Sequence, residues 1–172
     1  SFTGLRVGAT VAKALAHARG VPLYTAPSLM VRAAFDPQPG TTVLAFSNAL
    51  RGEVYAAVYR FPPGWVESLV PPSVWRPEQL IASFARPDVM VGEAPADIVA
   101  RLESWSGRSA AGTRAAWPRA ARLFDLRRRE GGAAAVLDVD HWEPDYGRPA
   151  EAQARWEQTH GRPLPNSAGH PG

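Results

Sequence analysis

The chain has 172 residues, 45% of them hydrophobic, and a formal net charge of +3, which suits one domain with a sizeable core and is weak evidence for nucleic-acid binding. It has no cysteine, which excludes disulfides, thiol catalysis and thiolate metal sites. No apolar run approaches the ~20 residues of a membrane-spanning helix, and no cationic and apolar leader is visible, so we expect a cytoplasmic protein.

The first twenty residues are predicted to form a helix that starts from a cap at Thr3, or at Ser1, and continues through Ala18. Gly20 is placed to end it in a left-handed conformation, and Pro22 prevents the helix from resuming. An apolar ridge and a row of small residues lie along the helix, the ridge formed by Leu5, Val11 and Leu15 and the row by Gly8, Ala12 and Ala16. Small residues let another helix approach closely. The pattern fits a helix packed inside its own domain as well as one that meets a partner chain.

Strands and helices alternate in the next part of the chain. Residues 21–25 are predicted to form a strand, and residues 28–34 a short helix. An apolar strand at 42–47 is expected to be covered on both faces. A second strand at 53–59 should point Tyr55, Ala57 and Tyr59 one way and Val54, Ala56 and Val58 the other. The turn residues at 48–52 join the two strands into a hairpin.

The second half continues the alternation. We expect a strand at 66–70 that is broken by Pro71 and Pro72, a helix at 77–84, a buried strand at 88–93 and a helix from 95 to about 105. A further helix over 119–129 is predicted to turn Leu123, Phe124 and Leu126 inward. Residues 142–149 must be extended. This order indicates a layered α/β fold.

No residues form a recognisable catalytic or metal site. The four histidines are not spaced as paired metal ligands on a helix would be. The chain has no Gly-x-x-x-x-Gly-Lys-Ser/Thr phosphate loop, and the backbone around Gly4 and Gly8 is a weak substitute. The paired carboxylates Asp138/Asp140 and Glu143/Asp145 flank extended, solvated segments. We therefore predict no catalytic residue, no metal and no cofactor.

Four motifs, in the right order, resemble the TsaB family, also called YeaZ. Residues 1–8 (Ser-Phe-Thr-Gly-Leu-Arg-Val-Gly), followed by Ala-Lys-Ala-Leu-Ala, are similar to its signature, and residues 51–59 are similar to its Arg-Gly-Glu-Val-Tyr hairpin. Gly92-Glu93-Ala94 stands where the family usually has Gly-Asp-Gly, and residues 142–149 resemble its closing Pro-x-Tyr-x-Arg segment. The aspartate that usually precedes the hairpin is missing, with Ser47 or Asn48 near its place.

The resemblance runs from Ser1 to about Gln153 and implies the actin-like, sugar-kinase-like ATPase fold (ASKHA, or Gcp-like), an α/β fold with two related subdomains. The signature lacks its leading Gly-Pro-Gly, so we expect a first subdomain that is incomplete at its N-terminus. Residues 1–35 are assigned to the remainder of that subdomain. Residues 36–160 are assigned to the second subdomain with its C-terminal extended segment, and residues 161–172 to a disordered tail.

The resemblance also implies a function. Family members are subunits of the complex that forms N6-threonylcarbamoyladenosine at position 37 of tRNAs reading codons that begin with A. They pair with the catalytic paralogue TsaD and work with the ATPase TsaE, so this chain is expected to be a non-catalytic scaffold, and a homodimer when alone. Pairing in the family uses the helix after the signature. The residues implied at the interface are Arg6, Val7, Thr10, Val11, Ala14 and Leu15.

Two other functions stay open. The first is an enzyme of the same fold, a kinase or acyltransferase with a phosphate loop ahead of Ser1. The second is an RNA-binding module in which Arg127, Arg128 and Arg129 contact tRNA phosphates, although a solvated helix face explains the same basic run.

Overall fold

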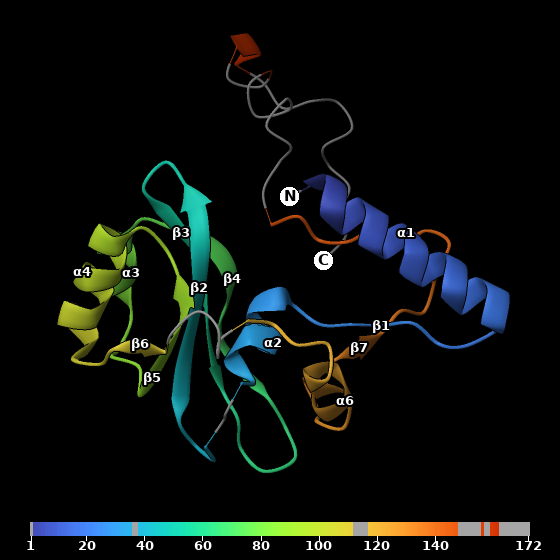
Figure 1. Ribbon diagram of the computed structural model, residues 1–172, viewed down its shortest axis with the longest axis horizontal. Coiled ribbons are helices and arrows are strands. Elements are labelled where there is room, and N and C mark those ends of the chain that lie inside the picture. Colours follow the sequence, from blue (N-terminus) through green and yellow to red (C-terminus); the bar gives the residue numbers. More distant parts are fainter. Residues whose placement is uncertain (1, 36–37, 112–116, 148–155, 157–158, 162–172) are drawn as a thin grey trace.

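The computed structural model describes residues 2–35, 38–111, 117–147, 156 and 159–161. Its main body is a five-stranded sheet in the order β4-β3-β2-β5-β6 (Figure 1). The strands are β2 (Thr42–Leu50), β3 (Glu53–Arg60), β4 (Glu67–Trp75), β5 (Val89–Glu93) and β6 (Ala110–Ala111). The pairs β2–β3 and β3–β4 are antiparallel, whereas β2–β5 and β5–β6 are parallel. The sheet is therefore antiparallel from β4 to β2 and parallel from β2 to β6.

Helices cover both faces of this sheet. The helices α3 (Pro77–Ser83) and α4 (Ala96–Ser106) lie on one face, and α2 (Ser28–Ala33) and α6 (Arg122–Arg127) lie on the other. The strand β2 sends Leu44 and Phe46 into the first core and Val43 and Ala45 into the second. The predicted two-sided burial of residues 42–47 is confirmed, and so are the two predicted sides of β3.

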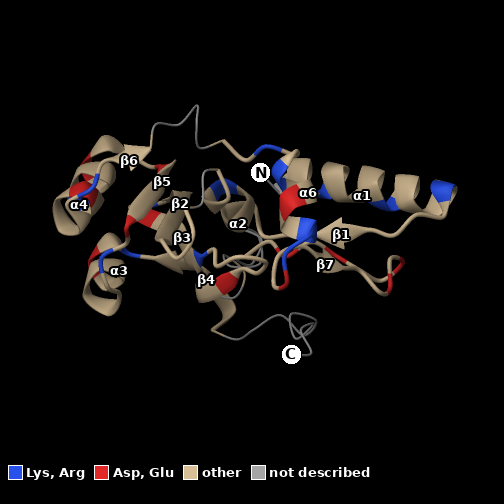
Figure 2. Cartoon of the chain, turned by 90° about the horizontal axis from the view of Figure 1, so that it is seen from below, with Lys and Arg blue, Asp and Glu red and all other residues tan. Residues whose placement is uncertain are grey.

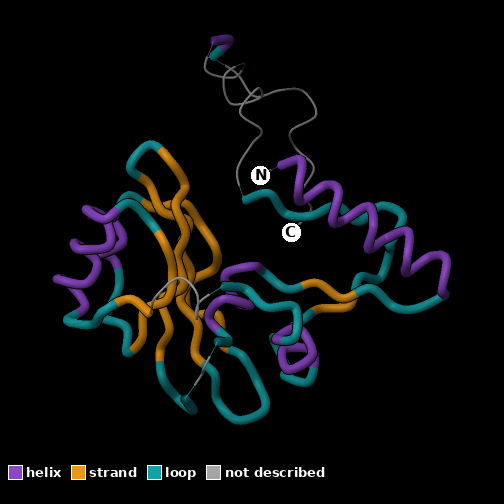
Figure 3. The backbone as a smooth tube through the Cα atoms, in the orientation of Figure 1, coloured by secondary structure: helices purple, strands orange, loops and turns teal. Residues whose placement is uncertain are grey.

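Helix α1 (Phe2–Arg19) stands apart from the five-stranded sheet (Figures 1 and 3). It leads into β1 (Tyr24–Thr25), which pairs antiparallel with β7 (Ala134–Ala135) in a small second sheet. The chain then returns along α1. Residues 142–149 are predicted to be extended, and the described part of that segment, residues 142–147, is extended. Of the predicted tail at 161–172, residues 162–172 lie outside the described residues. None of the helices in the described part of the chain is long and apolar enough to cross a membrane.

The two ends of α1 had different outcomes. Because the helix begins at Phe2, Thr3 lies inside it and the predicted cap at Thr3 is wrong; Ser1 lies outside the described residues. The predicted end is confirmed. Gly20 has a φ of 59°, and the N–H of Val21 donates to the carbonyl of Ala16 at 3.1 Å.

The prediction that Pro71 and Pro72 break the third strand is wrong, because β4 continues to Trp75. Val58 pairs with Val70 and Ala56 pairs with Ser73, so the two prolines fall in a register shift between these pairs. The strand is also at the edge of the sheet, where a missing N–H leaves no neighbouring strand without its donor.

The helix predicted over 119–129 is shorter than expected, since α6 spans only Arg122–Arg127. Of the three residues predicted to lie inside, Leu126 is buried, whereas Leu123 is 38% exposed and Phe124 is 69% exposed. A helix of fewer than two turns presents only a narrow stripe to the sheet, so its other apolar residues point elsewhere.

Candidate partner interface

Helix α1 has two unlike long faces. The inner face, toward the rest of the chain, carries Ala12, Lys13 and Ala16, of which Ala16 is buried. The outer face carries Val7, Val11 and Leu15, one helical turn apart. These three side chains are 59%, 52% and 58% exposed, so more than half of each aliphatic surface meets solvent. The helix is therefore apolar on a side that nothing in the described chain covers.

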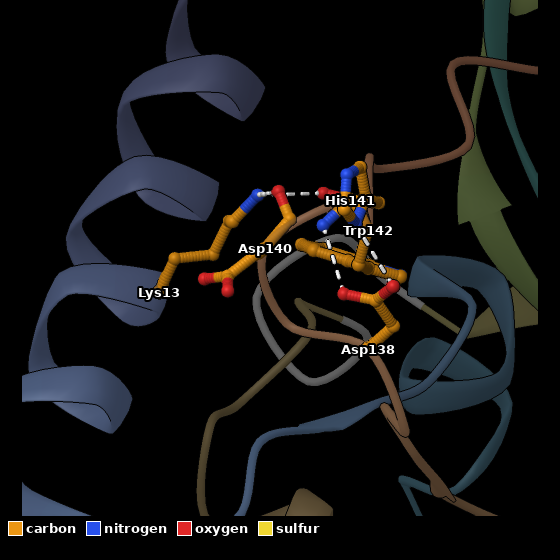
Figure 4. Close-up of polar contacts among 5 residues, drawn as sticks. All are labelled: Lys13, Asp138, Asp140, His141 and Trp142. Carbon is orange, nitrogen blue, oxygen red and sulfur yellow. Dashed lines mark hydrogen bonds and ion pairs between the residues drawn. The ribbon is translucent and has the colours of Figure 1, made fainter.

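Lys13 joins the inner face of α1 to the returning segment. The Nζ of Lys13 donates to the backbone carbonyls of Asp140, at 2.8 Å, and Trp142, at 3.0 Å (Figure 4). The turn beside it is closed by Asp138, whose carboxylate accepts the backbone N–H of His141 and lies 2.9 Å from its ring Nδ1. These bonds, the backbone one first, lower the pKa of Asp138. Near the start of the helix, Arg6 Nε donates to the hydroxyl of Tyr146 at 3.2 Å.

All six residues predicted at the interface are exposed: Arg6, Val7, Thr10, Val11, Ala14 and Leu15. The structure turns Arg6 toward Tyr146 and so places it at the edge of the outer face. The predicted small-residue row is divided, because Ala12 and Ala16 face the chain while a Cβ on Gly8 would meet nothing within 4 Å. The inner face therefore packs inside the chain, whereas contact of the open face with a partner chain stays a prediction.

The charge of α1 has one sign. The helix contains Arg6, Lys13 and Arg19 and no aspartate or glutamate (Figure 2). A surface that complements its outer face would combine an aliphatic stripe with acidic residues at the rim.

The hairpin that lacks the expected aspartate uses Asn48 for its turn. The Asn48 Oδ1 accepts the backbone N–H of Leu50 at 2.8 Å. Leu50 and Arg51 have φ values of 66° and 53°, ahead of Gly52 at 78°. Three successive residues with positive φ are costly, and a local side-chain acceptor helps to hold the turn. The strand β2 also reaches Leu50, so the turn is tighter than the predicted 48–52 link.

The strand end at Gly92 and Glu93 combines close packing with an ion pair. A Cβ on Gly92 would lie 2.3 Å from the carbonyl oxygen of Phe46, so close strand packing requires glycine there. Glu93 Oε1 lies 3.4 Å from Nη2 of Arg32, a buried residue of α2 whose Nη1 has no partner. Sequence reasoning missed Arg32, and its only signal was a charge inside an otherwise apolar short helix.

The three arginines of the predicted basic run, residues 127–129, have different surroundings. The guanidinium carbon of Arg127 lies 4.6 Å from the ring centroid of Tyr24, a cation–π contact with β1. Arg129 Nη1 donates to the carbonyl of Pro62 at 3.2 Å, whereas Arg128 is exposed. Within the described ranges, no group of three or more His, Asp or Glu side chains is placed to hold a metal ion.

Comparisons with known proteins agree with the motifs. The family model "TsaD: tRNA N6-adenosine threonylcarbamoyltransferase" matches residues 1–99. The chain is 31% identical over 163 residues to "tRNA threonylcarbamoyladenosine biosynthesis protein TsaB" of Bacillus subtilis (strain 168), covering 91% of this chain and 69% of that protein.

A solved structure shows the same fold. It is described as an uncharacterized protein with similarity to peptidase YEAZ from Pseudomonas aeruginosa, and it aligns with a TM-score of 0.54 at 19% identity over 86% of this chain and 69% of that one. The predicted actin-like, sugar-kinase-like α/β fold is confirmed. The chain belongs to the TsaB (YeaZ) family and contains the domain that the TsaD family model describes.

Proposed function

We propose that this chain is a non-catalytic subunit in the formation of N6-threonylcarbamoyladenosine at position 37 of tRNAs that read codons beginning with A. Its B. subtilis relative is named as a biosynthesis protein for this modification. The subunit pairs with a TsaD-like paralogue, and a TsaE-like ATPase joins the pair. Residues 1–35 belong to the first subdomain of the fold and residues 36–160 to the second.

The observation that carries the pairing is the open stripe of Val7, Val11 and Leu15 on α1. Fully burying one such side chain contributes about 1.5–3 kcal/mol. A partner that covers the exposed half of all three side chains therefore gains a few kcal/mol of binding free energy, before the costs of association are subtracted. Ala14 and Gly8 flank the stripe and let a partner helix come close. The isolated chain forms a homodimer through the same stripe, so the homodimer and the heterodimer exclude each other.

The test is co-purification of the chain with its TsaD-like paralogue from the same source. The variants are Val11→Arg and Leu15→Arg, and the matched control is Leu50→Arg. Leu15 and Leu50 are 58% and 59% exposed, but Leu50 lies at the tip of the β2–β3 hairpin, away from α1 (Figure 1). We expect the control to pair normally. Each α1 variant should weaken pairing by about 100-fold or more, because a charge stranded in an interface costs about 3–5 kcal/mol.

The outcomes separate the parts of the proposal. If wild type fails to pair, the scaffold function is refuted, and ATP binding by the chain would then favour an independent enzyme. If all three variants pair, the partner role stands but α1 does not mediate it. Sedimentation of the isolated chain, with and without Val11→Arg, tests the homodimer in the same way.

A further inference from the structure

A cavity of about 420 Å³ lies where α6 meets the turn at Gly64. Its charged lining residues are Arg122, Asp125, Arg128 and Arg129, and the remainder are Ala34, Gly64 and Leu126. Figure 2 shows basic and acidic residues side by side on α6. With three guanidinium groups against one carboxylate, the lining has a positive balance.

Two of these arginines are held by carbonyls of neighbouring loops. Arg122 Nη2 donates to the carbonyl of Phe35, and Arg129 Nη1 donates to the carbonyl of Pro62. A guanidinium has five N–H donors, and each of these bonds uses one. The anchored side chains therefore keep donors for a ligand and lose less conformational entropy when one binds.

The backbone around the cavity is fixed by hydrogen bonds. The N–H of Glu130 donates to the carbonyl of Gly64 at 3.0 Å, and the N–H of Val66 donates to the carbonyl of Glu130 at 2.7 Å. A Cβ on Gly131 would lie 2.5 Å from the Val66 carbonyl oxygen, so the two backbones are in close contact there. These contacts hold the segment that directly follows Arg129 against the turn at Gly64.

The chain at and after α6 brings three arginines to the cavity. Arg122 is the first residue of α6, and Arg128 and Arg129 follow its last residue. Arg127 lies on another side, over the Tyr24 ring. The arginines that share the cavity therefore differ from the predicted run of Arg127, Arg128 and Arg129, because Arg122 is among them and Arg127 is not.

We propose that the pocket of Arg122, Arg128 and Arg129 binds a phosphate group of an RNA backbone. Planar guanidinium groups pair with phosphate oxygens through two parallel N–H bonds, and each phosphodiester of an RNA backbone offers one negative charge and two non-bridging oxygens that accept such bonds. That the RNA is a tRNA rests on the proposed function, whereas the phosphate chemistry rests on the pocket alone.

The test measures the affinity of the chain for a fluorescent tRNA transcript across a series of salt concentrations. The variants are Arg128→Gln and Arg122→Gln/Arg128→Gln, and the matched control is Arg127→Gln, which removes the same charge from the residue directly before Arg128. We expect the slope of log affinity against log salt to fall by about 1 for the single variant and about 2 for the double, with about a tenfold loss of affinity at 0.1 M salt. The slope for Arg127→Gln should match wild type.

A second titration, with pyrophosphate at constant ionic strength, distinguishes the sources of phosphate. If the tRNA slopes of all variants coincide while pyrophosphate binds wild type and not the double variant, the RNA source is overturned and the pocket takes small phosphate compounds. If neither ligand distinguishes the double variant from Arg127→Gln, the pocket is refuted. Circular dichroism confirms folding, and the exposed Arg128 provides a variant that breaks none of the loop anchors described above. Normal pairing with the TsaD-like paralogue shows that any failure here is separate from failure of the proposed function.

Discussion

The five-stranded sheet and helix α1 are held in place by different forces. The sheet has an apolar cluster on each face, and side chains such as Phe46 and Leu102 are completely covered. Helix α1 is attached to the returning segment by the bonds of Lys13 on its inner face and of Arg6 at the edge of its outer face, and small alanines pack on the inner face. Its outer aliphatic stripe stays in water.

This difference shows where the chain is complete by itself. Burial of apolar area is the main source of stability in a domain, and the sheet already has it on both sides. Helix α1 buries few apolar atoms and relies on a few polar bonds, each worth about 1 kcal/mol. A helix of this kind gains more from a second chain than the sheet does.

The largest expected contrast uses two leucines on helices. Leu102→Ala should lower the free energy of unfolding by about 2–5 kcal/mol, because Leu102 is 0% exposed and its truncation leaves a cavity. Leu15→Ala should change it by less than about 0.5 kcal/mol, since the side chain is 58% exposed. Urea unfolding at a protein concentration too low for dimerisation measures both. Equal losses would contradict the division between the two regions.

Substituting alanine for a glycine should have opposite effects on stability in the sheet and in α1. Gly92→Ala should destabilise the sheet by about 1–3 kcal/mol, because the new Cβ would lie 2.3 Å from the Phe46 carbonyl oxygen. Gly8→Ala should stabilise α1 by about 0.5–1 kcal/mol, since the site is open and alanine favours a helix interior. Thermal melting followed by circular dichroism compares them, and a loss for Gly8→Ala would mean that α1 packs more tightly than the structure indicates.

The attachment of α1 is tested at Lys13. Lys13→Met keeps a long, helix-compatible side chain but removes the bonds to the carbonyls of Asp140 and Trp142. We expect local opening of the segment around residues 138–146 to become easier by about 1–2 kcal/mol while the sheet is unaffected. Amide hydrogen exchange measures this, with Arg19→Met, at the exposed end of the helix, as the control. Uniform loss of protection across the sheet would show that the two regions unfold together.

The smallest expected effect depends on pH. Thr42 donates its backbone N–H, at 2.8 Å, and its hydroxyl, at 2.7 Å, to Asp88 Oδ2, and these bonds lower the pKa of Asp88. The folded state therefore favours the carboxylate. Its stabilisation is present above the ordinary pKa of about 3.9 and is lost as pH falls through the lower folded value.

Thr42→Val removes the hydroxyl donor and should cost less than about 1 kcal/mol at pH 7, because the carboxylate is exposed. The gap between wild type and variant should close as pH falls below about 4. Unfolding at several pH values provides the measurement. A gap that is constant down to pH 2 would assign the effect to packing at Thr42 instead.

Much of the fold was predictable because its causes are local. Gly20 ends α1 and Gly107 ends α4 with φ values of 59° and 71°, a conformation that few other residues adopt without strain. Side chains of β2 and β3 alternate between two cores because successive residues of a strand point to opposite faces. The six candidate interface residues could be named because the motif resemblance marked their helix.

The errors came from features that depend on neighbours. Pro71 and Pro72 lie within β4 because that strand occupies the edge of the sheet, and strand order is not encoded in the dipeptide. Leu123 and Phe124 look like core residues, but α6 is too short to bury them with Leu126.

The sequence by itself determined the family, the alternating α/β order, the C-terminal ends of α1 and α4 and the two-sided core strand, since motifs, steric limits and side-chain periodicity act within a few residues. Only the tertiary structure decided which face of α1 is open, because that depends on Lys13 meeting carbonyls about 130 residues away. It also decided that Arg122 joins Arg128 and Arg129 around one cavity while Arg127 turns to Tyr24. Contacts between distant segments are set by how the packed elements meet, and no local pattern specifies them.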